Sequence, residues 1–178
     1  LDNLGLQRSE HVGARHTSVY GATVADKLTE CLRIYGDILM RPALPEDQFE
    51  AVRMGAEHSL LSIEDDPQRK TMIELRRRSF TRPWGLPADG SLADLPNITH
   101  DSLRSHFENC FRPNGSILGI AGKVNAKEVI QVIGGVLGEW PQKPVLEVSP
   151  GETGPKLDFI EQDTAQTHIG LSYKSVAY

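Results

Sequence analysis

Several features that decide the class of a protein are scarce in this sequence of 178 residues. No apolar stretch approaches the roughly 20 residues that cross a bilayer, so we expect no membrane span. Lysine and arginine together number 19 against 24 aspartates and glutamates. The resulting net charge of −5 argues against a general binder of nucleic acid or anionic membranes, which would be basic.

Cysteine is also rare, and the chain contains only Cys31 and Cys110. Both fall on apolar faces of expected helices, so we interpret them as reduced, buried thiols rather than a disulfide or a metal pair. His106 lies one helical turn before Cys110 and could in principle generate a thiolate. A core cysteine beside a surface histidine is the interpretation that we prefer.

The usual catalytic and nucleotide-binding motifs are absent. The sequence contains no GxSxG, GxxxxGK[ST] or GxGxxG pattern. Its six histidines include no HExxH or HxxEH, and the near misses at Gln7–His11 and Met54–His58 retain only the Glu-His end. Glutamine and methionine are poor zinc ligands, so we interpret both near misses as chance. The residues therefore predict no catalytic group and no metal ligand in this chain.

What the sequence does contain is a regular alternation of helical and strand patterns, clearest in residues 98–124. Thr99 is a good N-cap for a helix that Pro113-Asn114-Gly115 would end, because proline removes a donor and glycine permits positive φ. The apolar run 116–122 follows and is typical of a buried strand. Asn125 then begins a second amphipathic helix that we expect to reach Trp140.

The rest of the chain follows the same rules. We predict a loop or frayed helix end over 1–14, a strand over 16–24, helices over 24–40, 44–63 and 67–80, a loop over 81–97, and short strands over 157–160 and 167–173. The long loop suggests a binding role, and the alternative is that Trp84 anchors it. For Arg76-Arg77-Arg78 we favour a solvated face or pairing with the acidic residues 64–66 over a phosphate site.

The order of these features resembles the insulinase/pitrilysin and mitochondrial-processing-peptidase family of inverted-motif zinc peptidases. The resemblance is carried by the EDDP break at 64–67, by Phe111-Arg112-Pro113-Asn114 before the 116–122 run, by the helix over 126–140, and by Asp163–Thr167. It implies an α+β fold, with a mixed or antiparallel sheet packed against helices, as in a processing-peptidase-like metallohydrolase domain.

The resemblance also implies a domain organisation. Residues 1–140 would form the C-terminal part of a first peptidase-like domain, 141–156 a proline-rich linker, and 157–178 the first strands of a similar second domain. The HxxEH helix of the family would precede Leu1, and we expect about 60 residues to be encoded ahead of it, the length that the missing strands and helix need.

The third zinc ligand of the family is a glutamate just before the Glu-Asp-x-Pro segment, and Ser59 stands at that place in this chain. Glu57 lies two positions away, which rotates a helical side chain by about 200°. A serine is a poor zinc ligand at neutral pH. The resemblance therefore implies the inactive branch of the family, in which a degenerate half supports a catalytic partner or helps to enclose a peptide.

Three functional hypotheses remain open, and they leave open whether the whole protein is an enzyme. In the first, the chain is a non-catalytic segment of a zinc-peptidase-family protein, with a peptide or protein substrate and with a catalytic partner chain or a second copy. A sheet edge would then hold the peptide by strand addition. In the second, it is a piece of an active zinc endopeptidase whose HxxEH helix lies upstream, and zinc would bind only there. In the third, it is a scaffold domain with an unrelated ligand.

Overall fold

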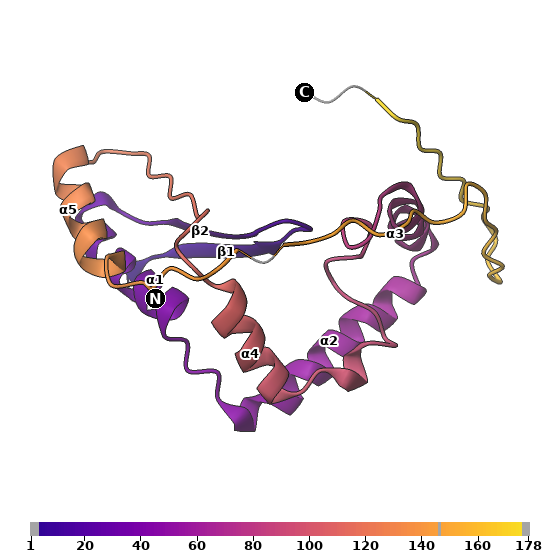
Figure 1. Cartoon of the computed structure of the whole chain (residues 1–178), viewed down its shortest axis with the longest axis horizontal. Coiled ribbons are helices and arrows are strands. Elements are labelled where there is room, and N and C mark those ends of the chain that lie inside the picture. The colour runs from indigo at the N-terminus through magenta and orange to yellow at the C-terminus, as the bar shows by residue number, and fades with distance from the viewer. Residues whose placement is uncertain (1–3, 146, 176–178) are drawn as a thin grey trace. The chain divides into compact units, whose positions relative to one another are not determined.

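The computed structural model describes residues 4–145 and 147–175, which divide into two compact units (Figure 1). The first unit contains the chain up to His11, the stretch Ser18–Gln48, and the described residues from Thr99 onward to 145. The second contains Val12–Thr17, Phe49–Ile98 and the described residues from Glu147 onward.

A two-stranded hairpin opens the chain. Strand β1 covers Gln7–Val12 and β2 covers Thr17–Ala22, and Gly13 donates its N–H to the carbonyl oxygen of His16 at 2.9 Å in the turn between them. The strand predicted over 16–24 is thus confirmed, whereas the loop predicted over 1–14 is wrong for β1. The sequence of β1 is polar except for Val12 and lacks the apolar alternation of a half-buried strand, so pairing with β2 rather than local pattern defines it.

Three helices complete the first unit. They are α1 over Leu28–Met40, α4 over His100–Cys110 and α5 over Ala126–Leu137. A 3-10 turn over Ala25–Lys27 precedes α1, so the helix predicted over 24–40 is confirmed. Helix α5 ends earlier than predicted, and the N–H of Gly138 bonds to the carbonyl oxygen of Gly134 at its end. Glycines weaken a helix interior, and they are concentrated in this last turn.

The helix caps form as the sequence predicts. The backbone N–H of Ser102 donates to Thr99 Oγ1 at 3.1 Å, and Thr99 N–H donates to Ser102 Oγ at 2.9 Å, which closes a capping box. At α5 the side-chain oxygen of Asn125 accepts from the N–H of Lys127 at 3.0 Å. Both caps satisfy donors that the first helical turn leaves without a partner.

The second unit is built on α2 over Phe49–Glu64 and α3 over Pro67–Ser79. Asp66 caps α3 by accepting from the N–H of Arg69 at 3.0 Å, and Pro67 occupies the first helical turn. The helix break predicted at 64–67 is therefore confirmed. A small hydrophobic core joins α2 to the loop over 81–97. It is formed by Leu60, Ile63 and Leu95, and Ala56, Ile73 and Leu92 pack against it.

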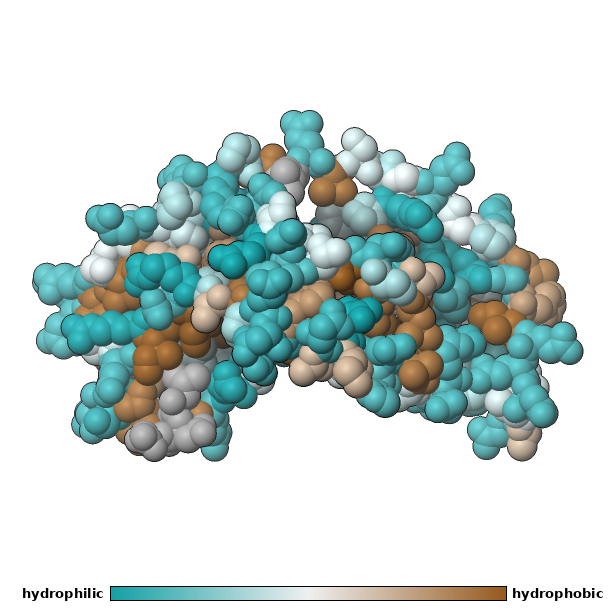
Figure 2. Space-filling view, turned by 90° about the horizontal axis from the view of Figure 1, so that it is seen from below, coloured by the Kyte–Doolittle hydropathy of each residue, from teal (hydrophilic) through white to brown (hydrophobic). Residues whose placement is uncertain are grey.

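Three segments that we predicted as strands are not strands in the structure. Residues 116–122, 157–160 and 167–173 pair with no other strand of the described chain. Their side chains are correspondingly open to solvent: Ile117 is 96% exposed and Leu171 is 72% exposed. Figure 2 shows apolar residues gathered at several places on the face that it presents. A strand is stable only when a neighbouring strand takes its backbone hydrogen bonds, and composition alone cannot supply that neighbour.

No helix within residues 4–145 and 147–175 combines the length and the apolar character that crossing a bilayer requires.

Candidate functional site

Ser59, which we expect at the place of the family's third zinc ligand, lies on the exposed surface of α2. Glu57, His58 and Ser59 are consecutive and all exposed, and the carbonyl oxygen of Ser59 accepts from the hydroxyl of Ser62 at 2.7 Å. The other near miss is also exposed, on β1, where Glu10 lies 3.8 Å from Arg8. Among residues 4–145 and 147–175, no three His, Cys, Asp or Glu side chains gather closely enough to hold a metal ion. That this chain binds no zinc stays a prediction.

The hairpin offers two sheet edges that no other described strand covers. The bond from Gly13 to His16 sets the register, so that Val12 lies opposite Thr17 and Glu10 opposite Val19. In such a ladder the backbone groups of Arg8, Glu10 and Val12 point away from β2. An extended peptide can therefore bond to this edge through its own backbone with little demand on its side chains.

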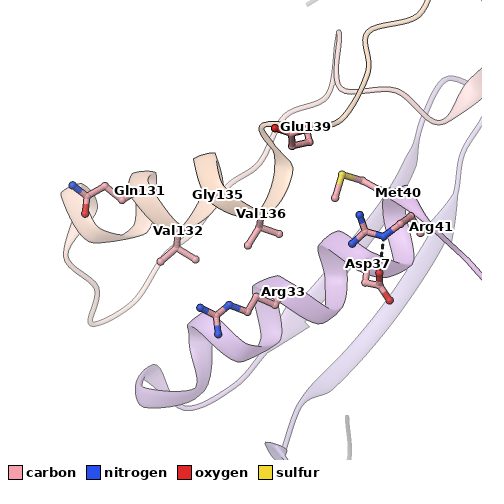
Figure 3. A pocket seen from close by; sticks show the side chains of 9 residues that line it. All are labelled: Arg33, Asp37, Met40, Arg41, Gln131, Val132, Gly135, Val136 and Glu139. Carbon is pink, nitrogen blue, oxygen red and sulfur yellow. Dashed lines mark hydrogen bonds and ion pairs between the residues drawn. The ribbon is translucent and has the colours of Figure 1, made fainter.

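A cleft of about 530 Å³ lies between α1 and α5 (Figure 3). Val132 and Val136 line it from α5 and Met40 lines it from α1. At its edge Arg41 pairs with Asp37, with 3.0 Å between Nε and Oδ1. The lining side chains include no serine, cysteine, threonine or histidine, and the carboxylates among them belong to Asp37 and Glu139.

The two cysteines lie on their helices as expected. Cys31 is 2% exposed, and Cys110 is half-buried. The sulfur of Cys110 lies 3.5 Å from Nδ1 of His106. In the second unit Trp84 is half-buried, and the guanidinium carbon of Arg15 lies 5.0 Å from its ring centroid. This cation–π contact holds the loop over 81–97 to the hairpin tip, in keeping with the anchoring alternative.

The arginines of α3 form intramolecular pairs, as predicted, but with other partners than the acidic residues 64–66. Arg77 and Arg78 both pair with Glu74, and Arg78 pairs in addition with Asp158. Arg76 stacks over Phe80, with 5.5 Å between the guanidinium carbon and the ring centroid. In the acidic stretch it is Lys70 that pairs with Glu64, at 2.5 Å.

Sequence reasoning missed the part that Arg82 plays in this cluster. Arg77, Arg78 and Arg82 line one cavity of about 510 Å³, together with residues 152–155. Those residues lie some 70 positions further along the chain, so no local pattern could have indicated that they meet the arginines.

Comparisons with known proteins identify relatives along nearly the whole chain. A family model described as "Peptidase M16 inactive domain" matches residues 97–178. A protein of Mycobacterium tuberculosis named an uncharacterized zinc protease is 20% identical over 182 residues, which cover 98% of this chain and 42% of that protein. The chain thus spans about two-fifths of the length of the curated relatives that it matches.

Solved structures show the same fold. A crystal structure described as a peptidase M16 inactive domain from Pseudomonas fluorescens superposes with a TM-score of 0.71 at 19% identity, covering 85% of this chain and 38% of that one. A protease from Helicobacter pylori gives 0.75 at 16% identity, covering 87% and 38%. These matches confirm the α+β fold class expected from the sequence.

Proposed function

Because residues 97–178 match the peptidase M16 inactive domain, we propose that this chain is a non-catalytic part of a zinc-protease-family protein. The match confirms the resemblance to the inactive branch of the family. The role of this chain would be to hold an extended peptide or a partner chain rather than to cleave. The observation that supports this proposal is the serine at position 59, on exposed α2, at the place where the resemblance puts the third zinc ligand of the family. A serine hydroxyl does not replace a carboxylate in such a site.

The hairpin is the feature that suits a peptide. Its edges present unpaired backbone donors and acceptors, and an added strand satisfies them without a dedicated pocket. The partner that completes the assembly would be a catalytic chain or a second copy of this one. We also propose the boundaries given above, with a first domain to residue 140, a linker over 141–156 and the start of a second domain. The absence of helix or strand in the described part of the linker supports them.

An active zinc endopeptidase, of which this chain is one piece, is the second candidate. The name zinc protease, which several relatives carry, favours it. An HxxEH motif in the full-length gene upstream of Leu1 would support this candidate, and its absence there would support the inactive one. A scaffold with an unrelated ligand would be favoured if neither zinc nor peptide bound.

Elemental analysis of the chain purified without chelator tests the inactive assignment. We expect no stoichiometric zinc and no cleavage of a peptide. A second sample carrying Glu57→Gln and His58→Ala tells where any metal sits, because loss of zinc from this variant alone would locate it on α2. One zinc per chain in the unsubstituted protein, or hydrolysis by it, would refute the proposal.

Peptide holding is tested at the hairpin edge. Glu10→Pro removes an outward N–H at a position whose backbone does not bond to β2, and proline is tolerated at such edges. The matched control is Glu10→Ala, which keeps that N–H. With a fluorescein-labelled peptide of alternating Thr and Val as probe, anisotropy should show binding that weakens in the proline variant alone. Equal binding by both variants would exclude the β1 edge, and Val19→Pro then tests the β2 edge.

A further inference from the structure

The cavity lined by Arg77, Arg78 and Arg82 also contains Glu74 and Glu152, and we propose that its arginines bind a small dianion, a phosphate or a dicarboxylate. All of its lining residues belong to the second unit. The proposal concerns this cluster alone and does not depend on the peptidase-family role.

The backbone of the 151–155 segment is held close to the arginines. The N–H of Gly151 donates to the carbonyl oxygen of Arg82 at 2.8 Å. At Gly154 a Cβ atom would lie 2.8 Å from Cγ of Arg78, so any side chain there would collide with the arginine. Glycine therefore lets the chain approach close enough to form one wall of the cavity.

The charges around the cavity are unevenly matched. The single carboxylate of Glu74 is shared by Arg77 and Arg78, and Asp158 pairs with Arg78 only. In the described part of the chain no carboxylate lies within pairing distance of Arg82, although its side chain lines the same cavity. Guanidinium groups bind phosphates and carboxylates through two parallel hydrogen bonds, so an arginine without such a partner is the natural first contact for an anion.

Two further donors in the cluster lack acceptors. Nε of Arg77 and Nε of Arg78 are both enclosed and have no hydrogen-bond partner among the described residues. Buried donors are rarely left without an acceptor, so the hydrogen bonding of these two guanidinium groups is incomplete. A dianion in the cavity would supply hydrogen-bond acceptors to guanidinium groups that have too few of them among the described residues.

Two lining residues, Glu74 and Glu152, oppose an anion, and Glu152 provides an inverse test. Glu152 lines the cavity, and no cation of the described chain lies within pairing distance of its carboxylate. Its negative charge should weaken binding of a dianion by repulsion. Neutralising Glu152 should therefore strengthen the same binding that neutralising Arg82 weakens.

Isothermal titration calorimetry of the full chain at fixed ionic strength measures these effects, with inorganic phosphate in one series and succinate in the other. Relative to the unsubstituted chain, Arg82→Gln should bind roughly tenfold more weakly, the value of one charge-assisted contact. Glu152→Gln should bind several-fold more tightly. Arg104→Gln is the control, because Arg104 is an exposed arginine of α4 in the first unit. This variant should bind both anions as tightly as the unsubstituted chain does.

The two series separate the sources of the ligand. Tighter binding of phosphate assigns the site to phosphorylated compounds, and tighter binding of succinate assigns it to dicarboxylates. Either result supports the proposal if Arg82→Gln weakens the binding of the preferred anion. Because the Arg82 side chain is exposed, an unchanged melting temperature will show that this variant is folded. Failure of both anions to bind, or equal binding by the Arg82 and Arg104 variants, would overturn the proposal.

Discussion

The contact between α1 and α5 leads to a prediction that can be worked out atom by atom. Gly36 is buried on α1, and a Cβ atom built on it would lie 2.3 Å from Cγ1 of Val136. Valine in a helix has one strongly preferred χ1 rotamer, so this methyl group cannot swing aside at low cost. Gly36→Ala must therefore push the two helices apart or distort one of them.

Two opposing effects set the magnitude. Forcing an extra methyl into a packed contact costs about 1–3 kcal/mol, and the short distance at Gly36 places it at the upper end. Alanine gains about 1 kcal/mol over glycine as a helix former. The net expectation is a loss of about 2 kcal/mol, which lowers the melting temperature of a domain of this size by roughly 4–8 °C.

The matched control is Gly55→Ala in the interior of α2, where a Cβ would meet nothing within 4 Å. There the helix-forming gain acts alone and should raise stability by about 0.5–1 kcal/mol. Thermal and urea denaturation followed by circular dichroism would show opposite signs for the two variants. The double variant Gly36→Ala, Val136→Ala should recover part of the loss, because it removes the colliding methyl group. Equal stabilisation by both single variants would refute the packing argument.

Three other outcomes are expected. Thr99→Ala removes the capping box of α4 and should cost about 1 kcal/mol in urea denaturation. Leu60→Ala should cost at least about 2 kcal/mol, whereas Leu61→Ala should cost far less in the same assay, because the two side chains are 6% and 46% exposed. Burial, and to a lesser extent Glu10, raises the pKa of Tyr35. Its contribution to stability should be present below about pH 10 and fall as pH rises through the raised pKa, a fall that Tyr35→Phe should reduce.

The helices could be predicted from the sequence because their determinants are local. Thr99, Asn125 and Asp66 act on backbone groups two or three residues away, and Pro67 acts on its immediate neighbours. Such interactions are visible in a short window of sequence. The proposal that Ser59 stands in place of a zinc ligand also rests on a local count, made from the nearby EDDP segment.

The sheet and the arginine cavity could not be predicted in this way. The partner of a strand is chosen by the whole fold, so the apolar run 116–122 has strand composition without a strand neighbour, while polar β1 is a strand because β2 pairs with it. Likewise, Arg78 meets Asp158 across 80 positions. Three adjacent arginines indicate positive charge, but only the fold shows which carboxylates neutralise it.

We propose that Ser59 stands where the family has a zinc-binding glutamate, and this assignment bears on where function resides. The contacts that stabilise each unit, such as Gly36 against Val136 and Leu60 against Leu95, involve no candidate ligand of a metal. On our proposal, a serine in place of a glutamate on exposed α2 leaves these packing contacts unchanged and removes a group that zinc would need. Under the same proposal, function would depend on surfaces rather than on a metal. The uncovered hairpin edges and the cluster around Arg82 are surfaces of that kind, and each can be removed by a substitution that should leave the helix packing intact.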